Sequence, residues 1–281
     1  MRNQRAIRAA MAAGAFAAAF GLGACSTVAG DAQTARNEAA ASGVERTALT
    51  TETPLGVGAV SLSTGVVTTP DDHPIKGIDV SKFQGTVNWS AVRGSNVSFA
   101  FIKATEGGDR VDDRFAENWA NARAAGVPHG AYHFYYFCRT GAEQAAWFIR
   151  NVPADPNALP PVLDMEWNHL SPSCKRRPDR VEVLREMGVF LRIVEKHYGK
   201  RPIIYSSVDF HRDRLVGAFP GHHLWLRSVA GHPSLKYHVS TSFSLWQHTA
   251  TGRNPGVVGN VDQNVYMGTA ESWRRLAATG Y

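Results

Sequence analysis

Hydrophobic and polar positions follow two alternating patterns from about residue 76 onward. Eight short apolar runs, rich in β-branched and aromatic residues, predict buried strands; they cover residues 77–83, 98–107, 130–138, 160–167, 201–207, 222–228, 243–249 and 261–268. Three amphipathic stretches predict helices over 112–126, 141–152 and 180–199, and Gly126 and Gly199 are typical stop signals for the first and third.

This alternation of strands with helices indicates parallel βαβ units. At least five strands are followed by a helical segment, whereas the last three, from about residue 223 to 266, have little between them that reads as helical. We therefore predict an α/β domain over residues 76–281, an irregular TIM-like barrel with a helical layer that is incomplete near its end. An open doubly wound sheet is the alternative, but no GxGxxG follows the first strand, so dinucleotide binding lacks its main signal.

The first 24 residues have the composition of an export signal. Arg2, Arg5 and Arg8 precede an Ala-rich apolar run without any acidic residue. The run closes on the tetrapeptide LGAC, which resembles a bacterial lipobox, and the resemblance implies a signal peptide over 1–24 and a lipid on Cys25. An ordinary secretory signal with a chance cysteine is the alternative.

Residues 25–75 are rich in Ala, Thr, Ser and Gly and show no sustained apolar period, which predicts a flexible tether. The whole chain carries a formal charge of +6, but removal of the signal leaves 27 basic against 24 acidic residues. Nucleic-acid binding thereby loses most of its support. Cys138 and Cys174 remain as a disulfide candidate in an oxidising compartment, with two unpaired thiols as the alternative.

Four carboxylates lie at predicted strand ends. Asp79 ends the first strand, Asp164 and Glu166 end the fourth, and Asp262 lies near the last. Functional side chains of parallel barrels lie at the carboxyl ends of the strands, so we expect all four at one mouth. Residues two apart on a strand share a face, so Asp164 and Glu166 point together while Met165 faces the helices.

Two facing carboxylates cannot both ionise cheaply, so one should stay protonated near neutral pH. A glycosidase needs this pair, one group as the acid for the leaving oxygen and one to stabilise the developing cation. Taken singly, each acid also fits a helix cap, a turn or an ion pair with Arg, and only their joint placement favours a site. Trp167 and Trp246 are candidate platforms for sugar rings, although aromatic residues most often fill core.

Other chemistries find little support. His129 and His133 are four residues apart, but on a predicted strand rather than on one helical face, and no Cys/His set has metal-ligand spacing. A GxSxG elbow is also missing. We expect no metal, no cofactor and no nucleophilic serine.

Taken in order, several segments resemble the glycoside hydrolase family 25 lysozymes. They are GIDVSKFQGTVNW, FAFIKATEG, GVPHGAYHFY, PVLDMEW, PIIYSS and LWQHTATGRNPGVVGNVDQNVY, within residues 76–268. The resemblance implies a (β/α)5(β)3 barrel. It also implies cleavage of the β-1,4 bond between N-acetylmuramic acid and N-acetylglucosamine in peptidoglycan.

Position by position, the resemblance implies that Glu166 is the proton donor and Asp164 its partner. Asp164 would act through the substrate's N-acetyl group or stabilise the cation directly. Asp79 and Asp262 match two further acids of the site floor. The family's sugar-contacting aromatic residues correspond to Tyr132, Tyr205 and Trp246. The segment 168–179 departs from the family as an enlarged loop beside Glu166, and a Cys138–Cys174 bridge would pin it to the third strand.

The leading hypothesis is a monomeric, lipid-anchored muramidase acting on peptidoglycan in the cell envelope of a diderm bacterium. Ser26, directly after Cys25, favours the outer membrane, facing the periplasm. A peptidoglycan-binding lipoprotein without activity is one alternative. A chitinase or another glycosidase on a related barrel is a second.

Overall fold

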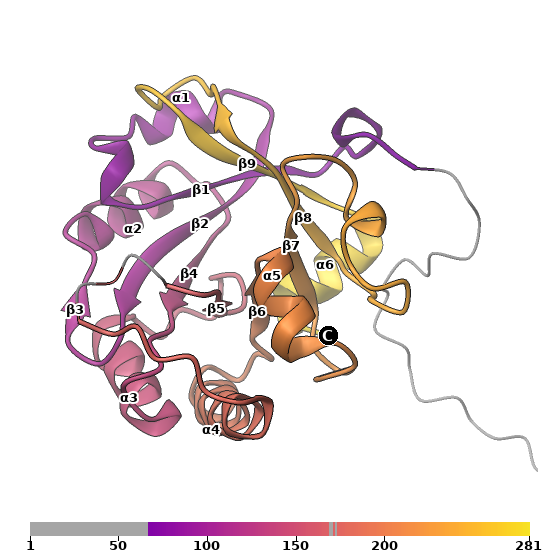
Figure 1. The fold of residues 1–281 in the computed structure, drawn as a ribbon. Helices are drawn as coiled ribbons and strands as arrows, with labels where there is room; N and C mark the ends of the chain where they lie inside the picture. The colour runs from indigo at the N-terminus through magenta and orange to yellow at the C-terminus, as the bar shows by residue number, and fades with distance from the viewer. Residues whose placement is uncertain (1–66, 169–170, 172) are drawn as a thin grey trace, which may run out of the picture. The chain divides into compact units, whose positions relative to one another are not determined.

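The computed structural model describes residues 67–168, 171 and 173–281 (Figure 1). The predicted signal peptide, Cys25 and most of the predicted tether lie outside these residues. In the described part, the packed structure begins before Lys76, since Pro70–Asp72 form a 3-10 turn (η1) and Ile75 is buried. None of the described helices is long and apolar enough to cross a membrane.

Nine strands form one sheet, in the order β1-β9-β8-β7-β6-β5-β4-β2-β3, and pairing of β1 with β2 closes it into an eight-stranded barrel. The short β3 lies outside the closed ring, as a hairpin on β2. The strand bounds are β1 (Lys76–Val80), β2 (Val97–Glu106), β3 (Arg110–Val111), β4 (His129–Phe134), β5 (Val162–Met165), β6 (Ile203–Ser206), β7 (Leu224–Arg227), β8 (Leu245–Gly252) and β9 (Val261–Tyr266).

All barrel strands run parallel to their neighbours except β9, which is antiparallel to both β8 and β1. All eight predicted strands are present, so the TIM-like barrel is confirmed and the open sheet is excluded. The predicted strand over 130–138 ends early, at Phe134, because the chain turns there toward the next helix.

Helices cover the outside of the barrel along the first five strand connections (Figure 1). The described helices are α1 (Trp89–Arg93), α2 (Phe115–Ala124), α3 (Gly141–Asn151), α4 (Arg180–Tyr198), α5 (Val208–Phe210), the π-helical η3 (His211–Leu215) and α6 (Ala270–Thr279). Two further 3-10 turns are η2 (Lys82–Gln84) and η4 (Pro233–Leu235). The connections from β7 to β8 and from β8 to β9 carry no α-helix, so the thinning helical layer is confirmed.

The long helix α4 shows why the predicted helices form. Asp179 caps its first turn by accepting a 2.8 Å hydrogen bond from the Glu182 amide, and Gly199 ends it with a φ of 68°. A left-handed residue at this position favours glycine. Its apolar stripe, which includes Met187 and Phe190, is buried against the barrel.

The core has separate layers inside and outside the barrel. Phe101, Trp225 and other inward side chains fill the barrel interior. A larger cluster lies between strands and helices and includes Met165, which therefore faces the helical layer as predicted. The helix α6, which the hydrophobic pattern did not predict, follows β9 and places Trp273 against Phe99, with ring centres 4.7 Å apart.

Candidate active site

A cavity of about 260 Å³ opens at the carboxyl ends of the parallel strands. Its lining comes from strands far apart in the sequence and includes all four predicted acids. The lining residues are Asp79, Ser81, Phe83, Gln84, Lys103, Tyr132, Phe134, Asp164, Glu166, Tyr205, Trp225, Arg227, Gln247 and Asp262. The expected convergence at one mouth is therefore present.

Strand geometry explains why the acids meet. Asp79 is the fourth residue of β1, Asp164 lies one residue before the end of β5, and Glu166 follows that strand directly. Asp262 lies at the start of β9, and because β9 is antiparallel its start is at the same mouth. The ladder places Asp262 opposite Asp79.

Two amide side chains hold Asp79 from the strands beside it. Gln247 and Asn264 are paired across β8 and β9, and both donate to Oδ2 of Asp79, over 2.9 and 2.8 Å. Each amide is itself oriented by an aromatic side chain. The Tyr205 hydroxyl donates to Oε1 of Gln247 over 2.9 Å, and the Trp225 indole donates to Oδ1 of Asn264 over 2.8 Å. Tyr205 and Trp225 therefore point each amide N–H at the carboxylate.

The four acids perturb one another because they share a buried site. Burial, followed by the charge of Asp262, raises the pKa of Asp79 to about 8, although the two amide hydrogen bonds favour its ionised form. Burial and the neighbouring Glu166 raise the pKa of Asp164 well above its usual value. Burial also raises the pKa of Glu166 and of Asp262. Asp79 therefore retains its proton at neutral pH, and burial favours the protonated form of the other three acids as well.

Two cations oppose this effect. Arg227, at the end of β7, lowers the pKa of both Glu166 and Asp262. Lys103, on β2, lowers the pKa of Asp164 and forms a 2.6 Å ion pair with Glu106. The two cations limit how many protons the four carboxyl groups hold.

The structure places the four predicted aromatic residues differently from one another. Tyr132 and Tyr205 line the cavity, as their inward positions on β4 and β6 require. Trp246 does not line it. Since the next residue, Gln247, faces inward, Trp246 points to the outer face of β8, where it is buried and donates to the Ser228 carbonyl over 2.9 Å. The structure therefore does not bring Trp246 to this cavity, where the lining tryptophan is Trp225.

Trp167 also lies outside the cavity lining. Glu166 opens into the cavity, and the following side chain turns the other way, against Phe137 and Phe210. Its indole donates to Asp213 over 2.9 Å, and the guanidinium groups of Arg177 and Arg214 each lie 4.9 Å from its ring. The ring is therefore part of the packing that supports the segment after Glu166, and the structure does not bring it to the cavity where the expected sugar platform would lie.

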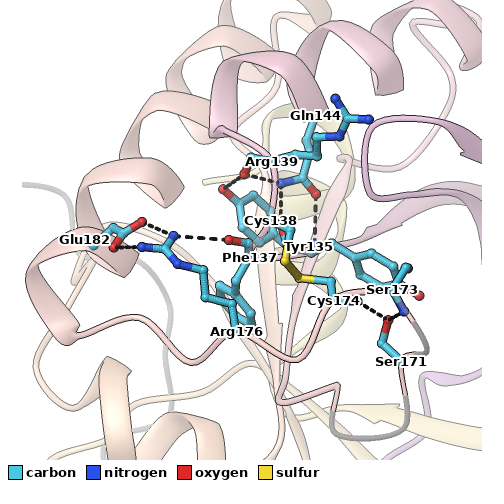
Figure 2. The surroundings of a disulfide bond; sticks show 11 residues. Tyr135, Phe137, Cys138, Arg139, Gln144, Ser171, Ser173, Cys174, Arg176 and Glu182 are labelled. Carbon is cyan, nitrogen blue, oxygen red and sulfur yellow. Dashed lines mark hydrogen bonds and ion pairs between the residues drawn. A yellow bond between two sulfur atoms is a disulfide. The ribbon is translucent and has the colours of Figure 1, made fainter.

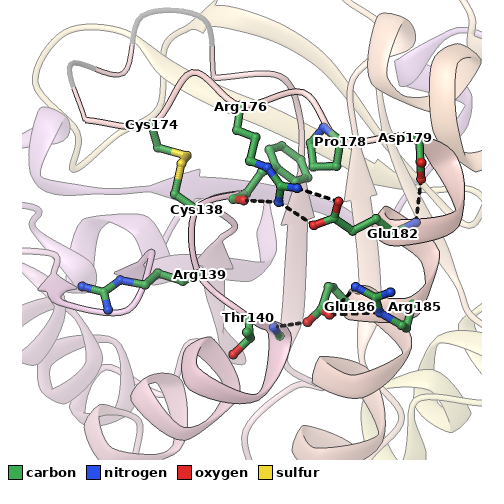
Figure 3. Close-up of polar contacts among 12 residues, drawn as sticks. Cys138, Arg139, Thr140, Cys174, Arg176, Pro178, Asp179, Glu182, Arg185 and Glu186 are labelled. Atoms are coloured by element: carbon green, nitrogen blue, oxygen red, sulfur yellow. Dashed lines mark hydrogen bonds and ion pairs between the residues drawn. A yellow bond between two sulfur atoms is a disulfide. The ribbon is translucent and has the colours of Figure 1, made fainter. Parts of the chain in front are cut away.

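The segment after Glu166 is tied to its neighbour by a disulfide between Cys174 and Cys138, with Cα atoms 5.8 Å apart (Figure 2). The alternative of two unpaired thiols is thereby excluded. Arg176, two residues on, donates to Glu182 in α4 over 2.7 Å and to the Phe137 carbonyl over 3.3 Å (Figures 2 and 3). The bridge joins the β4–α3 connection to the β5–α4 connection.

A second tie holds the same region from the helical layer. The Gly141 amide at the start of α3 donates to Glu186 of α4 over 2.7 Å, at the close approach of the two helices seen in Figure 3. A side chain at position 141 would overlap the Glu186 backbone, so glycine permits this approach.

Within residues 67–168, 171 and 173–281, no group of three or more His, Cys, Asp or Glu side chains has the arrangement of a metal site. His133 is fully buried and bonds to Thr105 and Gln144, so it supports the β4–α3 connection instead.

The pattern of the sequence did not single out Gln247, Asn264, Arg227 or Lys103. A usable signal was present, because each is a polar residue two positions from another inward-facing residue of its strand. Alternation shows that such a residue faces inward. It does not show which carboxylate the residue meets, because that depends on the neighbouring strands.

The sequence model of Glycosyl hydrolases family 25 matches residues 78–257. "Uncharacterized protein YegX" of Escherichia coli (strain K12) is 34% identical over 207 residues, which cover 72% of this chain and 73% of that protein. "Lysozyme M1" of Streptomyces globisporus is 34% identical over 225 residues, 74% of this chain and 72% of that protein.

Among solved structures, a family 25 glycosyl hydrolase from Bacillus anthracis superimposes with a TM-score of 0.68 at 37% identity, covering 78% of this chain and 99% of that one. The residues that the sequence model matches include Asp79, Asp164 and Glu166. The chain therefore belongs to glycosyl hydrolase family 25.

Proposed function

We propose that this protein is a peptidoglycan hydrolase, a lysozyme that cleaves the β-1,4 bond between N-acetylmuramic acid and N-acetylglucosamine. The observation that carries the proposal is the placement of Asp164 and Glu166, two residues apart at the end of β5, in one cavity with Asp79 and Asp262. Relatives with the printed names Lysozyme M1 and Autolytic lysozyme support the substrate class.

Glu166 is the proton donor in this proposal. An acid must be protonated when the substrate binds, and burial raises the pKa of Glu166 toward that state. It is also more exposed to the cavity than Asp164. Glu166 gives its proton to the glycosidic oxygen as the bond from that oxygen to the anomeric carbon breaks.

Asp164 assists from deeper in the cavity. Its Oδ1 atom is buried and has no hydrogen-bond partner among the described residues. A buried carboxylate oxygen favours a donor, and the N–H of the substrate's acetamido group supplies one. That hydrogen bond favours the ionised form of Asp164, which offsets positive charge at the anomeric carbon, directly or through the acetamido carbonyl oxygen. Water then adds its hydroxide to this carbon and returns a proton to Glu166.

The test compares the full chain with Glu166→Gln on purified sacculi, with mass spectrometry of the released fragments. The matched control is Glu117→Gln, which changes an exposed carboxylate on α2. Reducing muropeptides from the wild type and the control, but not from Glu166→Gln, support the proposal. Anhydro-muramic products would indicate lytic transglycosylation instead, and binding to sacculi without release would favour the binding lipoprotein.

We also propose that the mature chain is exported and anchored by a lipid on Cys25, in the outer membrane. The support is the sequence alone, from Arg2 to the LGAC tetrapeptide and the following tether. The wild type should incorporate labelled palmitate and Cys25→Ala should not. The variant should also be lost from the outer-membrane fraction. Equal fractionation of both proteins would contradict the anchor.

A further inference from the structure

Phe83 is an exposed aromatic ring at the edge of the acid cavity. It lies in η2, directly after β1, and is 81% exposed. Phe83 lines the acid cavity and also a second cavity of about 470 Å³. Lys103 also lines both cavities, so the two are adjacent. A single exposed apolar residue needs no explanation in general, but this one lines two adjacent cavities.

The turn that presents Phe83 is held in place. Ser81 accepts from the Phe83 amide, and Gln84 accepts from the Ser81 amide over 2.9 Å. The Lys82 amide donates to Asp112 over 3.1 Å, and Gln84 donates to the Asn260 carbonyl over 3.3 Å. These bonds tie the turn to the connections after β3 and β8, so the backbone that carries Phe83 is held at the cavity edge.

Charges in the second cavity largely cancel. Lys82 pairs with Asp113 over 3.1 Å, and Glu106 pairs with Lys103 over 2.6 Å and Arg110 over 3.7 Å. The rest of the lining is Phe83, Asp109, Val111 and Asp112. A cavity rich in hydrogen-bonding groups but without strong net charge suits a neutral polar ligand, and it does not suit a polyanion.

We propose that Phe83 and this second cavity form a further sugar subsite. One N-acetylhexosamine unit of the glycan chain stacks the apolar face of its ring on Phe83, and its hydroxyl and acetamido groups bond to the charged side chains beyond. The inference rests on the proposed function, because it takes the reacting bond to lie in the acid cavity. The glycan chain then runs from the acid cavity across Phe83 toward β3.

The test uses full-length protein with Phe83 changed to Ala, Leu or Trp. Peptide-free glycan strands and a short aryl glycoside are the two substrates. Stacking predicts that Phe83→Ala raises KM for long strands by about tenfold, which corresponds to about 1.4 kcal/mol, and leaves kcat unchanged. Phe83→Trp should restore the wild-type KM and Phe83→Leu should not. The KM for the short substrate should rise by much less than the KM for long strands. The matched control is Leu235→Ala, which truncates an exposed side chain that lines neither cavity.

A parallel binding measurement on Glu166→Gln separates this inference from the proposed function. If long glycan strands are cleaved and Phe83→Ala has the same KM as the wild type, the subsite proposal is overturned while the proposed hydrolase function is not. If Phe83→Leu restores the wild-type KM as fully as Phe83→Trp does, the sugar ring does not stack on an aromatic side chain at this position. The wild type could also bind glycan strands in a way that depends on the Phe83 ring and yet cleave none of them. That result would overturn the proposed hydrolase function and would still support the subsite.

Discussion

Gln247 on β8 donates a 2.9 Å hydrogen bond to Oδ2 of Asp79 on β1, although the two residues are 168 positions apart in the sequence. Asn264 donates to the same oxygen, and Tyr205 and Trp225 orient the two amides. The carboxylate at the barrel floor is therefore held at a single oxygen by β8 and β9. Burial raises the pKa of Asp79, whereas the two amide hydrogen bonds lower it.

Asp79→Asn should stabilise the protein and lower its activity. The folded pKa of Asp79 is about 8, above the ordinary 3.8, so ionisation opposes folding increasingly as pH rises from about 4 to about 8. Asn cannot ionise, and its carbonyl oxygen still accepts both amide hydrogen bonds. The gain in the free energy of unfolding of Asp79→Asn over wild type should be absent near pH 4 and largest above pH 8.

Thermal unfolding at pH 5, 7 and 9 measures this effect. Each 1 kcal/mol gained raises Tm by roughly 2–4 °C for a domain of this size. Glu117→Gln, which removes an exposed carboxylate, is the control. A Tm difference between Asp79→Asn and wild type that does not grow with pH would contradict a raised pKa.

Arg227→Gln should move the basic limb of the pH–rate profile to higher pH. Arg227 lowers the pKa of Glu166, so its removal raises that pKa. In the proposed mechanism Glu166 acts in its protonated form, so activity should persist to a higher pH. Arg227→Lys keeps the charge and should leave the limb near its wild-type position.

The profile is measured as kcat/KM on sacculi from pH 4 to 9. Arg192→Gln, on the exposed side of α4, controls for the change in net charge. A limb that stays in place in Arg227→Gln, or moves equally in both glutamine variants, would show that Arg227 does not act on Glu166.

Buried His133 should make the protein sensitive to acid. Its ring bonds to Thr105 over 2.7 Å and to Gln144 over 3.0 Å, and burial lowers its pKa to about 4. Because the unfolded pKa is higher, at 6.5, the unfolded chain binds the proton first. The free energy of unfolding should therefore fall as pH drops from about 6.5 to 4, by on the order of 2–3 kcal/mol from this group.

Urea unfolding between pH 4 and 7 measures the loss, and NMR of the imidazole assigns it. The exposed His197 provides the reference signal in the same spectra. Titration of His133 close to pH 6.5 would remove the physical basis of this prediction.

The disulfide should contribute stability by restricting the unfolded chain. It joins Cys138 and Cys174 across 36 residues, and a closed loop of that length corresponds to about 3–4 kcal/mol. Replacing both cysteines with serine should lower the free energy of unfolding by about that amount. Reduction of the wild type should give the same loss and should not change the double variant.

Guanidinium unfolding of oxidised and reduced protein measures this effect. Because the bridge pins the segment that follows Glu166, activity on sacculi should fall in the same samples. A double variant as stable as the oxidised wild type would contradict the prediction.

The sequence alone determined which residues share a face along the regular parts of the strands, because alternation has a period of two there. This period is interrupted by the register shifts in β2 after Lys103 and in β8 after Gln247. It also placed Asp79, Asp164 and Glu166 at strand ends, since apolar runs show where strands stop. Alternation from Glu166 and Gln247 assigns the neighbouring Trp167 and Trp246 to the outer face. The expectation that they bind sugar was drawn from residue type and resemblance rather than from the strand period.

Only the tertiary structure decided which inward residues meet. Closure of β1 on β2 and the antiparallel course of β9 place Asp262 opposite Asp79 and align Gln247 with Asn264. Strand order and register are long-range properties, set by how whole strands pair, and no local pattern encodes them. The same reason holds for the Cys138–Cys174 bridge, whose distance depends on two connections that meet only in the folded barrel.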